Sequence, residues 1–452
     1  MAFASSDTVG RLARGPGRGT AVRRRHAGQA LVVALGLLLA GGAMLHAMYS
    51  AARVAAAKQR LVDTADAAAW SAALWRARVL NYHAYANRAI LANEVAIAQS
   101  VTLLSWSKYF EQLTRNAATV GSVIPPARVI LEGVAEAASL ARESAELAAT
   151  LEIAARGAEG VGYRAILQAS QEILQLSTQG FGASMVAAEV ARANDPSFFA
   201  WVLPDPSGEW LGLTHRTESQ ADRRRFADLV QASLDPFVTG PRSADIGLPV
   251  PCLGLPVLRK RGATMLSEDL ERWEAVDTLS VHVNRPRRLR CRDGEALPLG
   301  WGAAEAGTEL GAVVGTERGV ADNPAANALA GTTIASFPSY SGIARVRELD
   351  YERLADPRFP SPVLAVLARQ PGEAVATSMS KGLAAGRMLP PDAFAGDGAP
   401  HLWALSAAQV YFRRPVDAPE RIEYASLFNP YWQVRLAPPT AAHRAIALGY
   451  VR

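Results

Sequence analysis

The pattern of apolar and polar positions is dominated by one stretch, from Gly28 to about Leu91. Residues 27–50 carry no Asp, Glu, Lys or Arg. In a helix, at about 1.5 Å per residue, a segment of this length crosses the roughly 30 Å hydrocarbon core of a bilayer. Residues 51–91 contain no Pro or Gly and are rich in Ala, Leu and Arg, which favours continued helix. We therefore expect one long helix, anchored in a membrane at its start and packed against protein further on.

Beyond the apolar run, apolar and aromatic residues recur along this helix every seven positions. The repeat consists of Leu61, Ala68, Trp75, Tyr82 and Ala89. Apolar residues at this spacing form a seam that packs on other helices, either of the same chain or of neighbouring subunits. We interpret Trp75 and Tyr82 as packing residues, with a binding groove as the alternative. The pattern extends the helix to about residue 118.

Further along, proline and glycine divide the chain into a helical part and a mixed part. Pro125 and Pro126 end the first helix, and residues 127–156 and 163–194 read as two more helices, the last interrupted at Gly180. We expect residues 51–196 to form a helical bundle continuous with the membrane helix of residues 27–50.

From residue 197 onward, aromatic and β-branched runs alternate with turn residues, which predicts strands. The expected strands are 198–203, 209–214, 278–284, 365–367, 374–378, 402–412 and 431–436. A helix is expected at 221–235, and short helices with long loops at 301–335. The fold class is thus α+β: a transmembrane helix, an Ala-rich bundle, and an α+β domain of residues 197–452. In this domain we expect strands near the start and near the end to pair across the intervening sequence.

Charge is concentrated at the N-terminus. Residues 1–25 hold six Arg and one Asp, while basic and acidic residues balance in the rest of the chain. The formal charge of +5 is therefore a property of the tail, which argues against nucleic acid as a partner. Arg residues before a first membrane helix stay in the cytoplasm. We expect a disordered cytoplasmic tail (1–26), a bilayer-spanning helix and the bulk of the chain outside, with a cleaved secretory signal as the alternative.

The junction between tail and helix resembles the N-terminal module of TadE/TadG-like Flp (tight-adherence) pilus-assembly proteins. The resemblance rests on residues 23–30 (RRRHAGQA), the apolar helix, and residues 59–69 (QRLVDTADAAA). It covers about residues 20–80 and implies a bacterial inner-membrane protein with a periplasmic domain. The implied partners are other pilus or secretion-system envelope proteins.

Two features of this family bear on processing and on metal binding. Members that prepilin peptidase cleaves carry Glu five residues after the cleaved Gly, whereas Val33 stands five residues after Gly28. Cleavage between Gly28 and Gln29 and a retained anchor both stay open, and we expect the anchor to be retained. Larger members often carry an Asp-x-Ser-x-Ser metal pentad; Asp205-Pro206-Ser207-Gly208 comes near it but does not match, so we expect no metal site.

Catalytic and cofactor motifs are missing from the sequence. It contains no Gly-x-Ser-x-Gly, Walker loop, His-Glu-x-x-His or dinucleotide fingerprint, and its seven His residues are scattered. We expect no catalytic, cofactor or metal residues. Cys252 and Cys291 would form a disulfide in an oxidising periplasm, with two unrelated thiols as the alternative. The sequence favours a non-enzymatic, pilin-like envelope protein; the rival hypothesis is a membrane-anchored periplasmic hydrolase or sensor.

Overall fold

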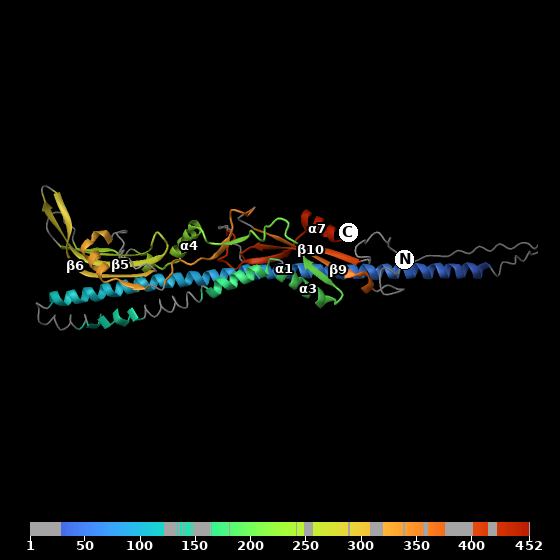
Figure 1. Ribbon diagram of the computed structural model, residues 1–452, viewed down its shortest axis with the longest axis horizontal. Helices are drawn as coiled ribbons and strands as arrows, with labels where there is room; N and C mark the ends of the chain where they lie inside the picture. The colour runs from blue at the N-terminus through green and yellow to red at the C-terminus, as the bar shows by residue number, and fades with distance from the viewer. Residues whose placement is uncertain are drawn as a thin grey trace, which may run out of the picture.

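A single long helix organises the whole molecule. The computed structural model describes residues 29–121, single positions between 133 and 147, 163, 165–179, 181–240, 242–247, 256–287, 290–307, 320–337, 340–354, 356, 360–375, 401–414 and 423–451. Helix α1 (Gln29–Gly121) has 93 residues without a break, a length of about 140 Å. The molecule is elongated, and its two larger sheets lie along α1 at separate stretches (Figure 1). The predicted continuation of the helix to about residue 118 is confirmed.

One lobe, which we call the proximal lobe, is built on a four-stranded antiparallel sheet next to the first half of α1. Its strand order is β1-β9-β10-β11. The strands are β1 (Phe199–Val202), β9 (Val363–Pro371), β10 (His401–Phe412) and β11 (Trp432–Leu436). β1, near the start of the 197–452 region, thus pairs with β9 in its later part, and the intervening sequence lies between them in the chain, as predicted. The core between sheet and helix contains many alanines of α1, among them Ala65, Ala68 and Ala72, because small side chains let the sheet approach closely.

The second lobe, called the distal lobe, is built on a five-stranded sheet at the far end of α1. The strands are β3 (Ala244–Ile246), β4 (Pro256–Leu266), β5 (Arg272–Arg287), β6 (Arg290–Gly307) and β7 (Ala335–Phe337). They follow one another in order, antiparallel except for β6 with β7. Ile97, Val101 and Leu104 of α1 complete its core. The prediction of loops and short helices at 301–335 is wrong at residues 301–307, which belong to β6, and right for α6 (Pro324–Thr332).

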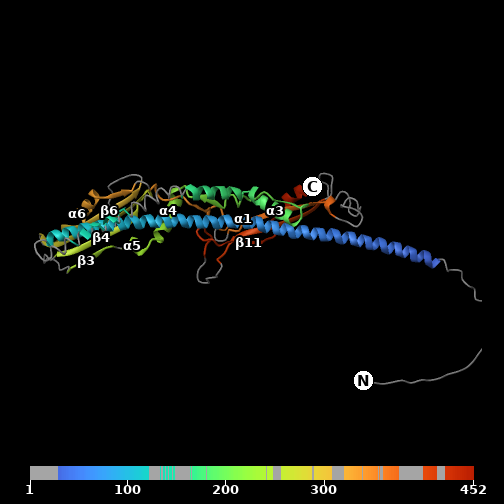
Figure 2. The ribbon, with the colours of Figure 1, turned by 90° about the horizontal axis from the view of Figure 1, so that it is seen from below.

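Shorter elements surround and link the two lobes. Residues 165–177 and α3 (Phe181–Asn194) run back along α1, with a turn at Thr178 and Gln179. Figure 2 shows this return segment beside α1. The other elements are β2 (Thr214–Arg216), α4 (Gln220–Ala232), α5 (Pro236–Thr239), β8 (Arg347–Leu349), α7 (Ala441–Val451) and the 3-10 turns η1 (Val320–Asp322) and η2 (Gly372–Ala374). The 209–214 strand is wrong except at Thr214, because Asp205 accepts backbone hydrogen bonds that fold this segment into turns.

The face of α1 that packs on the rest of the chain is only partly the predicted one. Leu61 and Ala68 are fully buried, Trp75 and Tyr82 are half-buried, and Ala89 is exposed. A neighbouring seven-residue repeat stays buried throughout: Ala69, Arg76, His83, Ile90, Ile97 and Leu104. The predicted seam therefore lies at the edge of the buried face after Ala68. The predicted helix at 127–156 falls mostly on residues outside the described ranges.

Candidate functional site: the long helix and the pocket beside it

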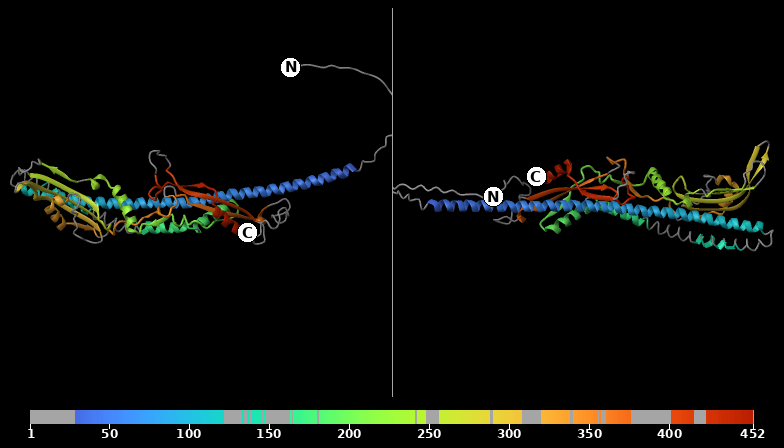
Figure 3. Two further views of the ribbon diagram at one scale, coloured as in Figure 1. Left: turned by 90° about the horizontal axis from the view of Figure 1, so that it is seen from above. Right: turned by 180° about the vertical axis from the view of Figure 1, so that it is seen from behind.

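The first part of α1 is apolar and bare. Within the described residues, α1 is the one helix long and apolar enough to cross a membrane, and none of its most apolar window is buried. Leu31 is 75% exposed and Leu38 73%. From Ala57 onward the helix begins to be covered by the rest of the chain. Figure 3 shows the bare segment projecting beyond both lobes.

Two pairs of residues singled out from the sequence are only partly described. Gln29 is the first residue of α1, whereas Gly28 lies outside the described residues. Cys291 lies on β6, where its backbone is paired with that of Pro286 on β5. Cys252 lies outside the described ranges. Processing at Gly28 and the disulfide both stay predictions.

Polar side chains of α1 fix the proximal lobe on the helix. Asn87 donates to the backbone carbonyls of Arg347 and Leu427, at 2.7 and 2.8 Å. Nearer the start of the helix, Asn81 both donates to and accepts from the backbone of Trp432. Directional bonds to buried backbone groups leave little freedom of rotation around the helix axis. The sheet is thus locked to one face of α1.

A buried arginine marks the junction of α1 with the return segment. The Arg76 guanidinium lies 4.4 Å from the Trp210 ring centre and donates to the Thr178 carbonyl at 3.2 Å. Burial lowers the pKa of Arg76 to about 10, and the charge of Asp205 opposes this shift. A cation over an indole face at a dry site contributes attraction beyond that of an exposed pair. Arg76 thus joins α1 to the turn at Thr178 and to the segment that carries Trp210.

In the distal lobe an aspartate joins the sheet to α1. Asp277 on β5 is fully buried. It accepts hydrogen bonds from Arg242 and Lys260, at 2.9 and 2.7 Å, and from the Ser105 hydroxyl of α1 at 2.9 Å. The Lys260 ammonium also lies 4.0 Å from the Tyr109 ring centre. Two cations around one carboxylate compensate for its burial, so this cluster is a structural anchor.

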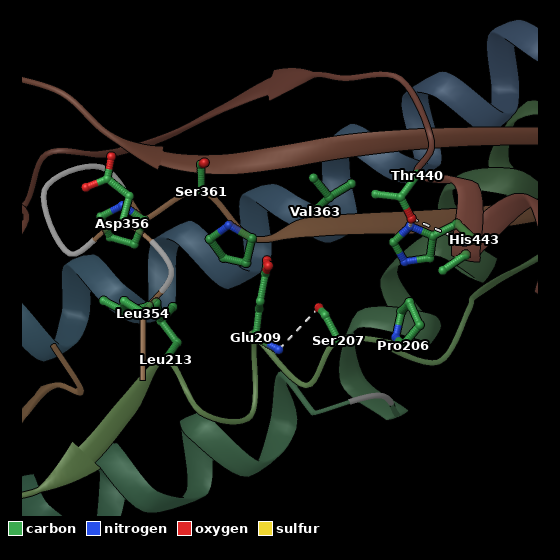
Figure 4. A pocket seen from close by; sticks show the side chains of 13 residues that line it. Pro206, Ser207, Glu209, Leu213, Leu354, Asp356, Ser361, Val363, Thr440 and His443 are labelled. Carbon is green, nitrogen blue, oxygen red and sulfur yellow. Dashed lines mark hydrogen bonds between the residues drawn. The ribbon is translucent and has the colours of Figure 1, made fainter. Parts of the chain in front are cut away.

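A pocket of about 460 Å³ lies in the proximal lobe, between the turn after β1, the start of β9 and the start of α7. Its titratable side chains are those of Glu209, Asp356 and His443. Figure 4 shows Asp356 and His443 at opposite ends, with Glu209 between them. Of the motifs considered in the sequence, only the incomplete metal pentad Asp205-Pro206-Ser207-Gly208 contributes residues to this pocket, namely Pro206 and Ser207. In the structure Asp205 accepts from the Ser207, Gly208 and Trp210 amides, which shapes the pocket wall.

The histidine of this pocket is arranged as a structural residue. His443 Nδ1 lies 2.8 Å from the Thr440 hydroxyl, which also accepts the His443 amide and thus caps α7. Burial lowers the pKa of His443, with Asp205 opposing and Arg76 adding to the shift. The Ser207 hydroxyl donates to Asp205 at 2.9 Å. The pocket therefore combines one imidazole and two carboxyl side chains with a mostly apolar lining. Within the residues described, no group of three His, Cys, Asp or Glu side chains is placed to hold a metal ion.

Comparison with known proteins adds no relative: no family model, curated protein or solved structure matches this chain.

Proposed function

We propose that this protein is a non-enzymatic, single-pass envelope protein that assembles with other envelope proteins through its long N-terminal helix, as a component resembling the TadE/TadG-like pilus-assembly proteins. The observation that carries the proposal is α1 itself. Its bare apolar segment continues without a break into the stretch that completes the cores of both lobes. An apolar surface of this extent favours a lipid environment over water. The segment that enters the membrane and the segment that carries the two lobes are therefore parts of one continuous helix.

A rigid helix of this length supports a scaffold role. From residue 57 to residue 121, α1 extends about 100 Å. With the Arg-rich tail on the cytoplasmic side, the proximal lobe stands next to the periplasmic face of the bilayer and the distal lobe far from it. Both lobes are locked to α1 by buried polar contacts, Asn87 for one and Asp277 for the other. The helix thereby fixes how far the distal lobe stands from the membrane and which way it faces around the helix axis.

Extraction and mass measurement on membranes containing the full chain test the anchor and its processing. We expect the protein to resist an alkaline carbonate wash and to keep its N-terminus, apart from Met1, with or without prepilin peptidase. A chain beginning at Gln29 only with the peptidase would favour a pilin-like subunit able to leave the bilayer. Release of an intact chain by carbonate would contradict the membrane-anchor proposal.

The pocket favours a second candidate function, a membrane-anchored periplasmic hydrolase or sensor. Its two carboxyl groups and its imidazole line one cavity. A screen of the full-length protein with ester, phosphoester and glycoside substrates tests this candidate, alongside thermal shifts with small polar ligands. Turnover or a shift that Glu209→Gln or Asp356→Asn removes would favour it over the scaffold role.

A further inference from the structure

The helix of residues 165–177 exposes much of its apolar surface. Its most deeply buried side chains are polar: Gln171 and Gln175 are 3% exposed, whereas Leu167 is only partly buried against the distal core. Large aliphatic residues lie on the opposite face: Ile166, Ile173 and Leu176 are 64–69% exposed. A surface helix normally buries its apolar stripe and exposes its polar one. This arrangement calls for a partner on the outer face.

The polar inner face is held by specific bonds, so the helix is not simply rotated. Gln171 donates to Asn87 at 3.0 Å, and Gln175 lies 3.2 Å from His83 Nε2. Glu172 binds Arg347 through both carboxylate oxygens, each at 2.7 Å. Turning the apolar stripe inward would break all of these bonds and bury Ile and Leu against amides. The outward stripe is thus a fixed property of the fold.

The exposed stripe has the spacing of a coiled-coil seam. Ile166, Ala169, Ile173 and Leu176 follow the alternating three- and four-residue steps of a heptad. Ile166 and Ile173 take the first core position, and Ala169 and Leu176 the second. Isoleucine at the first position with leucine at the second favours two parallel strands. We propose that this stripe pairs with the same stripe of a second copy of the chain, forming a parallel homodimer; the proposal rests on the membrane anchoring argued above.

The stripe lies outside the bilayer, so lipid does not cover it, and its helix carries no unpaired charge among the described residues that would repel a second copy. Gln171 and Thr178 contact α1 at Asn87 and Arg76, about 40–55 Å along the helix from Ser50. The bilayer therefore ends well below the stripe. Glu172, the charged residue described in this helix, is engaged by Arg347, so two copies meet without like-charge repulsion.

Membrane anchoring also sets the geometry that a parallel pair needs. Two copies inserted in the same direction carry the stripe at the same height, with Ile173 of one facing Ile173 of the other across a two-fold axis. Confinement to one bilayer raises the local concentration, which compensates for the short seam. A second copy of the chain inserted in the same membrane meets both of these requirements.

The stripe supplies a compact apolar surface for a dimer. Its large apolar side chains are Ile166, Ile173 and Leu176, with Tyr163 at the start of the helix, each 64–69% exposed. At about 100 Å² each they present on the order of 400 Å² per copy. This is about half of what each partner contributes to a standard interface, so the seam depends on the confinement to one bilayer.

The test is the mass of the full-length protein in detergent by light scattering, with matched variants. Ile173→Glu places a charge in the seam, and Ile246→Glu changes an equally exposed isoleucine of β3. We expect the wild type and Ile246→Glu to have twice the 48.0 kDa of one chain, and Ile173→Glu to fall to one chain with an unchanged circular dichroism spectrum. A monomeric wild type, or a dimer that survives Ile173→Glu, overturns the proposal.

A photo-crosslinking amino acid at position 173 tests the same contact within the membrane. An adduct of two identical chains, absent with the probe at position 246, supports the homodimer. An adduct with a different protein, or none, overturns it. Carbonate extraction of the same membranes is independent of these outcomes, so loss of the anchor and loss of the dimer are distinguishable.

Discussion

Glu274 on β5 lies directly opposite Glu305 on β6, and both side chains are buried. One oxygen of each carboxyl group has no hydrogen-bond partner, while Glu305 accepts from Ser336 at 2.6 Å. Burial raises the pKa of Glu274 to about 7; nearby Arg272 opposes the shift, and Glu305 and Asp269 add to it. Like charges directly opposite one another destabilise a sheet. Below neutral pH, the pair therefore carries a proton.

This pair predicts a stability that falls as pH rises from about 4.5 to 7. In that window the unfolded chain loses the Glu274 proton and the folded chain keeps it, so the free energy of unfolding decreases by about 1–3 kcal/mol. Glu274→Gln should remove this part of the slope and be more stable than the wild type at pH 8. Denaturant unfolding at several pH values measures it, with the exposed Glu352→Gln as control. An unchanged slope in Glu274→Gln would contradict the assignment.

Removal of the buried aspartate between α1 and the distal sheet should be strongly destabilising. Asp277→Ala leaves Arg242 and Lys260 without their common carboxylate, a cost of about 3–5 kcal/mol. Asp245→Ala removes a half-exposed partner of Arg261 and should cost less than about 1 kcal/mol. Urea unfolding of both variants, followed by Trp fluorescence, compares them. Equal costs would show that the Asp277 cluster is not an anchor.

The close approach of β6 to α1 depends on a glycine. A Cβ at Gly302 would collide with the backbone of Ser105 and Tyr109, whereas one at Gly294 would meet nothing within 4 Å. Gly302→Ala should therefore lower the free energy of unfolding by at least about 2 kcal/mol and Gly294→Ala by much less. Limited proteolysis should cut the distal lobe faster in Gly302→Ala alone. Equal protection in both variants would refute this packing.

Charges in the bare segment of α1 should abolish membrane retention. Leu35→Asp with Leu38→Asp places two carboxylates in the apolar window, at about 2.5–3.5 kcal/mol each if they lie at the bilayer centre. The double variant should appear in the carbonate-soluble fraction. Leu211→Asp, at a leucine 57% exposed in the proximal lobe, should remain with the membranes. Retention of the double variant would mean that this segment does not anchor the chain.

Local patterns in the sequence were sufficient for the long helix and for the sheet of the proximal lobe. The end of α1 near residue 121 and the positions of β1, β9, β10 and β11 follow from Pro placement and from continuous apolar runs. β9 and β10 are buried at most of their positions, and the first part of α1 is uniformly apolar, so their sequences form continuous apolar runs. The strand and helix predictions at these positions were correct for that reason.

Contacts between distant segments decided the rest. The β4–β6 sheet carries Asp277 and Glu305 at buried positions and Lys260 at a half-buried one, because their partners come from other strands and from α1. The pattern of apolar residues in this sheet is therefore weak. The sequence predicted only residues 278–284 of the hairpin formed by β5 and β6. Likewise, the residues of 165–177 show a heptad, but only the bonds of Gln171 and Gln175 to α1 decide that the apolar side faces outward. Periodicity records which residues share a face of a helix; the partners of its polar residues determine which face is buried.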